Sequence, residues 1–173
     1  MNMTRRDLGI ISISVAIGAT GAGRMAMAVV SDSVHAKVKA VLDGWNDSWN
    51  ASDMTAMSNL FVDDAHWVNV VGMHWRGKGE IMKALSSYFE LMFKERSSAL
   101  DEIESIEPLP GGAFVTVVRW SMGGFKQPDG VVRPPGKDRM SLVMIPRGDG
   151  LAIAHGANIA IVAEAAPFDP IKR

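Results

Sequence analysis

The chain contains no cysteine and only one tyrosine among its 173 residues. Without cysteine it cannot carry a disulfide scaffold, a thiol nucleophile or a thiolate metal site. Neither sign of charge is in excess, because 18 lysine and arginine residues balance 19 aspartate and glutamate residues and leave a net charge of −1. A surface for binding nucleic acid is therefore not expected.

The usual signatures of metal and nucleotide sites are also missing. The four histidines, His35, His66, His74 and His155, show no ligand spacing such as His-x-x-x-His. No glycine-rich nucleotide fingerprint follows a predicted strand, and there is no Gly-x-Ser-x-Gly elbow. We therefore expect no metal and no bound cofactor.

Residues 1–28 are predicted to be an export signal and not part of the fold. The pair Arg5-Arg6 precedes an apolar, glycine-containing stretch over residues 8–23, which is too short and too weakly apolar for a membrane span. Ala26-Met27-Ala28 then offers the small-x-small pattern of signal peptidase sites. Because paired arginines resemble the twin-arginine signal, we expect residues 29–173 in the periplasm or outside the cell, with no membrane contact. The alternative is an uncleaved N-terminal anchor.

Apolar residues at helical spacing predict three helices in the mature chain. The first covers about residues 33–50. The second carries its apolar stripe over residues 54–61, and Asp63-Asp64 is expected to end it. The third covers about residues 79–94.

Segments rich in β-branched and aromatic residues predict five strands. They are residues 66–71, 99–109, 113–122, 139–145 and 151–162. A loop rich in glycine and proline covers residues 123–138, and residues 163–173 form a tail. This order predicts an α+β fold in which three helices pack on one face of a curved, mostly antiparallel sheet. The hollow beneath such a sheet is a default ligand site, and the loop is a candidate lid for it.

Seven short motifs follow one another between residues 34 and 170. They are Trp49-Asn50-Ala51-Ser52-Asp53, Leu60-Phe61-Val62-Asp63-Asp64-Ala65, Trp67-Val68-Asn69-Val70-Val71-Gly72, Trp75-Arg76-Gly77, Val118-Arg119-Trp120, Arg139-Met140-Ser141-Leu142-Val143 and Glu164-Ala165-Ala166-Pro167-Phe168-Asp169-Pro170. Together they resemble the nuclear transport factor 2-like superfamily, its SnoaL-like branch, and within that branch the SgcJ/EcaC group. The resemblance implies a cone-shaped, cystatin-like fold, commonly a homodimer, and for that group an oxidoreductase label.

The resemblance also bears on catalysis. Isomerases of this superfamily place a carboxylate base on the strand after the second helix, and here Asn69 falls at that position. Their oxyanion-binding tyrosine lies on the first helix, where this chain has Trp45. An amide does not take a proton at neutral pH, and an indole N–H donates one hydrogen bond without relaying a proton. Both differences argue against isomerase chemistry of that type, but they leave hydrogen-bond donors for a ligand.

Seven residues are predicted to bind a ligand in the hollow. They are Trp45, Trp49, Trp67, Asn69, Tyr88, Arg119 and Asn158. Asn69 and His155 are the candidate catalytic groups, and a bulge at Gly156 would turn His155 and Asn158 inward together. Each candidate also has a purely structural alternative. The tryptophans could belong to the hydrophobic core, and Asn69 could form hydrogen bonds within the protein. Arg119 could form a cross-strand ion pair, and His155 could lie on the surface or have its hydrogen bonds satisfied in the core.

Two kinds of function are consistent with these features. The first is an exported domain that binds an apolar small molecule, acting as an isomerase, cyclase or lyase on a carbonyl compound. The second is a non-catalytic binding module or dimeric interaction module with the same fold. An oxidoreductase role, implied only by the resemblance to the SgcJ/EcaC group, is a weaker alternative.

Overall fold

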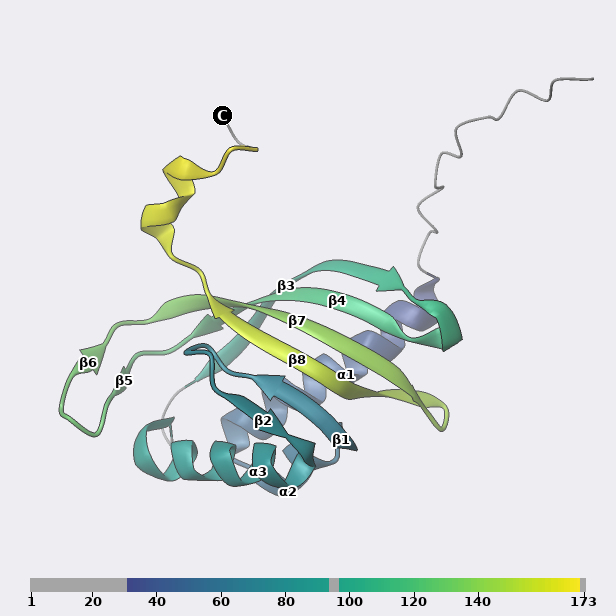
Figure 1. Cartoon of the computed structure of the whole chain (residues 1–173), viewed down its shortest axis with the longest axis horizontal. Helices are drawn as coiled ribbons and strands as arrows, with labels where there is room; N and C mark the ends of the chain where they lie inside the picture. Colours follow the sequence, from purple (N-terminus) through teal and green to yellow (C-terminus); the bar gives the residue numbers. More distant parts are fainter. Residues whose placement is uncertain (1–30, 94–96, 172–173) are drawn as a thin grey trace, which may run out of the picture.

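A computed structural model of the chain describes residues 31–93 and 97–171 (Figure 1). The predicted export signal, residues 1–28, lies outside the described residues. None of the helices formed by the described residues is long and apolar enough to cross a membrane.

The first helix, α1 (Asp32–Ala51), matches its prediction to within two residues. The Ser31 side chain caps its start by accepting a hydrogen bond from the backbone N–H of Val34. Ser52 ends it in the left-handed conformation, with a φ of 54°. The apolar stripe that predicted α1 is its buried face: Val38, Val41, Leu42, Trp45 and Trp49.

The second helix, α2 (Met54–Ser58), is shorter than predicted, and strand β1 (Phe61–Val68) begins almost at once. Asp63 and Asp64 therefore lie exposed on a strand, and the prediction that they end a helix is wrong. Phe61 is fully buried and pairs with Ile153, a residue far away in the sequence. Because this pairing is tertiary, helical spacing alone did not indicate that the chain is extended from Phe61 onward.

A turn leads from β1 to the short edge strand β2 (His74–Arg76), which is followed directly by α3 (Gly77–Tyr88). A single π-helical segment, η1 (Phe89–Phe93), extends α3. The third predicted helix is thus confirmed in position but divided into two helical forms.

The second half of the chain is built of strands, as predicted. They are β3 (Ser98–Pro108), β4 (Phe114–Met122), β5 (Phe125–Lys126), β6 (Val132–Arg133), β7 (Gly136–Arg147) and β8 (Gly150–Ala160), with short 3₁₀ segments η2 (Pro110–Gly112) and η3 (Ala163–Phe168). The loop expected over residues 123–138 contains β5 and β6, which pair only with each other.

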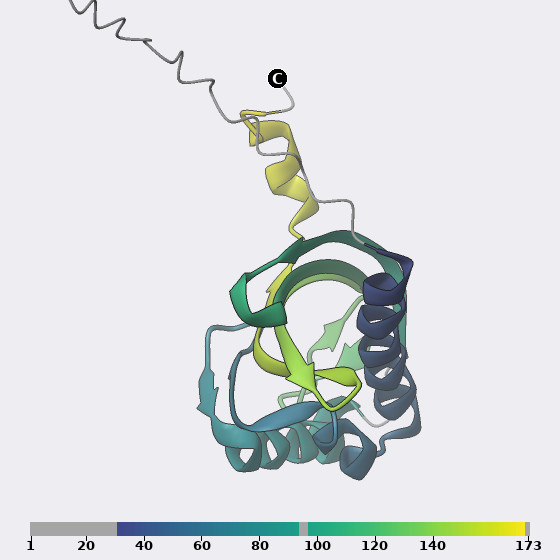
Figure 2. The ribbon, with the colours of Figure 1, turned by 90° about the vertical axis from the view of Figure 1, so that its right-hand side faces the viewer.

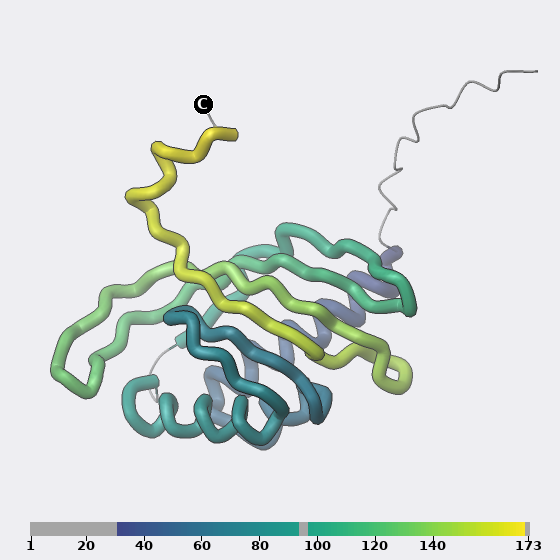
Figure 3. Tube along the Cα trace, viewed as in Figure 1, coloured from purple at the N-terminus to yellow at the C-terminus, as the bar shows by residue number. Residues whose placement is uncertain are grey.

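Six strands form the main sheet, in the order β2-β1-β8-β7-β4-β3. All neighbours are antiparallel except β1 and β8, which run parallel. Figure 2 shows the sheet strongly curled, with α1 lying along its open side and α3 beneath it. The tube in Figure 3 shows the same layering, with β8 leading out of the sheet into the C-terminal tail. The expected α+β architecture, three helical segments on a curved and mostly antiparallel sheet, is therefore confirmed.

Candidate functional site

A cavity of about 520 Å³ lies between the helices and the inner face of the sheet. This volume falls within the range of ligand pockets, roughly 300–1,000 Å³. Its lining comes from α1, α3, η1, the strands β1, β2, β4, β7 and β8, the β1–β2 turn and the β5–β6 hairpin, and it is mostly apolar. The expectation of a hollow under the sheet is thus met by a measurable cavity.

Aromatic rings form one wall of the cavity. Four of the five tryptophans line it: Trp45, Trp49, Trp67 and Trp75. Trp45 stacks on Trp67 with ring centroids 4.9 Å apart and an interplanar angle of 14°, and the Trp49 ring centroid lies 6.3 Å from that of Trp45. Such a stack makes this wall rigid and apolar, while the rings themselves stay buried, with Trp45 2% and Trp67 3% exposed.

Two buried polar atoms in this lining have no hydrogen-bond partner. The indole N–H of Trp45, a side chain only 2% exposed, has no acceptor, and the carbonyl Oδ1 of Asn158 has no donor. A buried polar group left unpaired costs about 1–3 kcal/mol, so such atoms call for an explanation. One unpaired donor and one unpaired acceptor therefore belong to side chains that line the same cavity, although both atoms are themselves buried.

Asp138, near the start of β7, is a site residue that sequence reasoning missed. It is 8% exposed, and its Oδ2 accepts a hydrogen bond from Asn158 Nδ2 at 3.2 Å. Among the described residues that line the cavity, it is the only carboxylate. In the sequence Asp138 was assigned to the end of a charged loop. It is, however, the first of a series of every second residue that continues with Met140, Leu142 and Met144. That period of two indicates an inward-facing side chain.

Asn69 and Tyr88, two predicted ligand residues, line the cavity near its edge. Asn69 lies in the β1–β2 turn and not on a strand, and its Oδ1 accepts hydrogen bonds from the backbone N–H groups of Val71 (3.1 Å) and Met73 (2.8 Å). The backbone-bonded alternative for Asn69 is therefore the one observed. The Tyr88 hydroxyl donates to Met73 Sδ at 3.2 Å.

Arg119 is not part of the cavity, which corrects its assignment as a ligand residue. It points to the outer face of the sheet, because β4 alternates and its inward positions are held by Val118 and Trp120. Its guanidinium contacts the carboxylates of Glu102 (2.5 Å) and Glu104 (3.1 Å) on β3. Arg119 therefore forms the cross-strand ion pair that was its structural alternative.

His155, the other catalytic candidate, also faces outward and does not line the cavity. The bulge lies at Ala154, two residues earlier than expected, between the Val143–His155 and Met144–Ile153 pairs. Gly156 and Asn158 consequently face inward together, while His155 stands beside His66 on the outer face. Among the described residues, no group of three or more histidine, aspartate or glutamate side chains is arranged to hold a metal ion.

The outer-face ion pairs predict acid sensitivity. Contacts with Lys137 and Ser121 lower the pKa of Asp101, and contact with Arg139 lowers the pKa of Glu104. Because a lowered carboxyl pKa favours the folded state when the group is ionised, the stabilisation is present above the ordinary pKa and is lost as the pH falls below it. We expect Arg139→Gln to destabilise the protein by about 0.2–1 kcal/mol near pH 6, typical of exposed pairs.

That loss should shrink between pH 5 and pH 3, where the carboxylates become protonated in both proteins. Urea unfolding at each pH measures it. A difference that stays constant over this range would show that the pairs do not carry the effect.

The β5–β6 hairpin forms part of the cavity wall. Phe125 lines the cavity and meets Phe93 of η1 edge to face, with ring centroids 5.0 Å apart. Gln127, Arg133 and Pro134 line the same side. The segment expected to be a lid therefore touches the site, and its opening and closing stay a prediction.

A model of SnoaL-like domains matches residues 42–155. The chain belongs to the SnoaL-like family. No match was found among curated proteins. A protein from Caulobacter vibrioides, described as uncharacterised with a cystatin-like fold, superposes on this SnoaL-like chain with a TM-score of 0.76 and 29% identity, covering 81% of this chain and 98% of its own.

Two other solved structures show the same nuclear transport factor 2-like fold. A ketosteroid isomerase-like protein from Erwinia carotovora atroseptica has a TM-score of 0.60 at 18% identity, covering 77% of this chain and 99% of its own. A nuclear transport factor 2-like superfamily protein from Salmonella enterica serovar Typhimurium has a TM-score of 0.65 at 20% identity, covering 77% and 94%. The cavity between helices and sheet therefore belongs to a fold shared across the superfamily.

Proposed function

We propose that this SnoaL-like domain binds an apolar, fused-ring carbonyl compound in its tryptophan-lined cavity and catalyses proton transfer next to the carbonyl. The observation that carries the proposal is the buried, unpaired indole N–H of Trp45, a residue that lines the same cavity as Asp138. A donor without an acceptor fits a ligand oxygen, and a buried carboxylate fits an acid or base.

The residues that line the cavity indicate which ligand skeleton would bind there. The half-buried rings of Trp75, Phe93 and Phe125 offer apolar surface to the cavity, and the buried Trp45–Trp67 stack lies in the same lining. Burial of apolar surface contributes about 25 cal/mol per Å², so a fused-ring skeleton gains more here than a small polar metabolite. Polar contacts at Trp45 and Asn158 would then fix its orientation.

The proposed proton transfer needs only side chains of this protein. The Asp138 carboxylate removes a proton from the carbon between a carbonyl and a C=C bond. The electron pair moves onto the carbonyl oxygen to give a dienolate, which accepts a hydrogen bond from the Trp45 N–H. Asp138 then returns the proton to the γ-carbon, so the C=C bond moves into conjugation and no atoms are gained or lost. General acid–base catalysis of this kind contributes about 10²–10⁴-fold.

The Erwinia relative is named ketosteroid isomerase-like, which agrees with this reaction class. At 18% identity that likeness shows the fold alone, so the proposal depends on the residues of the cavity. Here the carboxylate comes from β7, whereas the position expected for a base holds Asn69.

The same cavity without turnover would make the protein a non-catalytic binder, and measurement of turnover separates the two. The SgcJ/EcaC oxidoreductase alternative is tested by the absorption spectrum of the purified protein, because a redox chromophore would be visible there. Export by the twin-arginine route is tested by cell fractionation after replacement of Arg5 and Arg6 with lysine.

The binding experiment uses a fused-ring α,β-unsaturated ketone as the probe. Its binding should quench tryptophan fluorescence, because four of the five tryptophans line the cavity. Trp45→Phe keeps the ring and removes the N–H, so we expect the probe's Kd to rise about 3- to 12-fold, in line with the loss of one hydrogen bond.

Trp120→Phe is the matched control, because Trp120 also has a buried, unpaired N–H but does not line the cavity. We expect this control to leave the Kd unchanged. Equal Kd values for the wild type and Trp45→Phe, or no binding by the wild type, would refute the proposed role of the cavity.

A further inference from the structure

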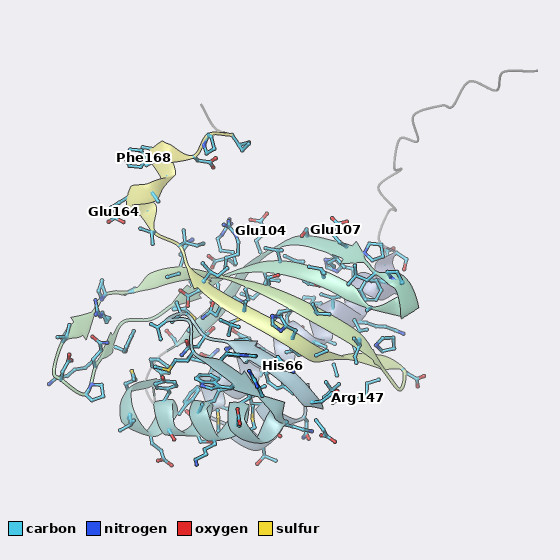
Figure 4. All side chains as sticks on the ribbon, viewed as in Figure 1. His66, Glu104, Glu107, Arg147, Glu164 and Phe168 are labelled. Carbon is cyan, nitrogen blue, oxygen red and sulfur yellow. The ribbon has the colours of Figure 1, made fainter. Side chains whose placement is uncertain are left out.

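Two histidine rings meet on the outer face of the β1–β2 hairpin. The Nδ1 atom of His66 and the Nε2 atom of His74 lie 3.0 Å apart, and the two ring planes are inclined by 26°. Both residues are exposed, and Figure 4 labels His66 on β1, the strand that lies between β2 and β8. Neither residue lines the cavity, so the pair takes no part in the proposed reaction.

The register of the hairpin brings these two rings together. Trp67 pairs with Trp75, so His66 and His74 are diagonal neighbours on the other face of the two strands. Diagonal neighbours lie within reach of long side chains. In the sequence the two histidines are eight residues apart, which matches none of the usual ligand spacings. Spacing alone therefore did not predict that they act as a pair.

The distance between the two nitrogens suits two ligands of one metal ion. Bonds of about 2.0–2.1 Å to one ion place two imidazole nitrogens about 2.9 Å apart at a right angle and about 3.3 Å apart at the tetrahedral angle. The observed 3.0 Å lies between these values. In the hydrogen-bonded pair one ring donates its N–H to the other. If that proton moves to the second nitrogen of its own ring, both facing nitrogens present a lone pair.

The charges around the pair do not oppose a divalent cation. Arg76, the cross-strand partner of His66, adds a positive charge on the same face of the hairpin. Asp64 lies two residues before His66, is also exposed, and adds a negative charge on that face. Because these two charges have opposite signs, an ion at the histidine pair meets little net repulsion.

We propose that His66 and His74 together bind one divalent late transition-metal ion, such as Zn²⁺ or Cu²⁺, with water completing its coordination. Neutral imidazole nitrogen is a common ligand of both ions. The ion joins β1 to the edge strand β2. Because Trp67 and Trp75 pair on the opposite face of this hairpin and line the cavity, the ion holds that wall from the outside.

Isothermal titration of Zn²⁺ into the purified full chain tests the site. The chain has no cysteine and only four histidines, so few other side chains compete for the ion. We expect one tightly bound Zn²⁺ per wild-type chain. The Kd should rise about tenfold or more in His66→Gln and in His74→Gln, because a single ring loses the second, intramolecular ligand.

His35→Gln is the matched control, because His35 is exposed on α1 and lies away from the hairpin. This control should bind Zn²⁺ like the wild type. All three variants change exposed side chains, so without metal they should have the urea midpoint of the wild type. A wild type that binds no Zn²⁺, or Kd values for His66→Gln and His74→Gln equal to that of the wild type, would overturn the proposal.

Amide hydrogen exchange then shows whether the ion spans the two strands. In the wild type, Zn²⁺ should slow exchange of the β2 amides severalfold, because a bound ion stabilises the closed hairpin. In His66→Gln the same Zn²⁺ concentration should leave β2 exchange unchanged. If Zn²⁺ bound the wild type without slowing β2 exchange, one ring alone would hold the ion, and the bridging site would be rejected.

Discussion

Replacing Asp138 with asparagine is expected to lower kcat for isomerisation of a fused-ring β,γ-unsaturated ketone by about 10²–10⁴-fold, the usual contribution of a general base. The substitution keeps the shape of the side chain. It also keeps an oxygen that can accept the hydrogen bond from Asn158 Nδ2, now 3.2 Å from Asp138. The cavity should therefore stay intact, and the affinity for the conjugated product should change less than threefold. Absorbance of the conjugated enone follows the reaction.

Glu107→Gln serves as the control for Asp138→Asn, because it makes the same chemical change on the exposed outer strand β3. Its kcat and KM should equal those of the wild type. If Asp138→Asn turned over substrate as fast as the wild type, Asp138 could not be the base. If the wild type bound the probe but converted none of a series of fused-ring ketones, the protein would be a non-catalytic binder.

Gly156→Ala should be among the most destabilising single substitutions in the chain. Gly156 is buried on the inner face of β8, and an added Cβ would overlap the Trp67 ring and lie 3.0 Å from Leu142 Cδ2. Trp67 has little room to move, because its ring stacks on Trp45 at 4.9 Å. Overpacking of this kind costs about 1–3 kcal/mol, and we expect the upper end from the urea midpoint.

The same substitution should weaken probe binding, since a displaced Trp67 ring would change the shape of the cavity that it lines. Gly79→Ala is the comparison, because a Cβ there meets nothing within 4 Å and Gly79 lies in α3. A helical Gly→Ala change should be neutral or stabilising.

A double-mutant cycle adds Trp67→Leu to Gly156→Ala. If the overlap is the cause, the pair should be less destabilising than the sum of the two single changes by about 0.5–3 kcal/mol. If the destabilisation of the double variant equals the sum of the two single changes, the overlap between the added Cβ and Trp67 is not the cause.

Residues whose role is local could be placed from the sequence. The apolar stripe from Val34 to Trp49 predicted α1 within two residues, because 3.6-residue periodicity is a property of a short segment. Trp45, Trp49, Trp67, Asn69, Tyr88 and Asn158 were all predicted to face a hollow, and all six line the cavity. Their role in binding a ligand stays a prediction.

The sequence did not predict the direction of side chains that depends on strand register. Asp138 was assigned to the end of a charged loop, and the pairing of β7 with β4 and β8 shows that the strand includes it and turns it inward. Arg119 and His155 were assigned to the site, but a one-residue change of alternation or bulge position sends a strand side chain to the opposite face.

The amino-acid sequence by itself determined the helices, most of the strands, the α+β class and the absence of thiol chemistry, because composition and periodicity act over a few residues. Only the tertiary structure decided that β1 starts at Phe61, that Gly156 makes room for Trp67, and that Asp138 shares a cavity with Trp45. Those facts arise when strands distant in sequence pair in one register, and the register is set by how the whole sheet buries its inner face.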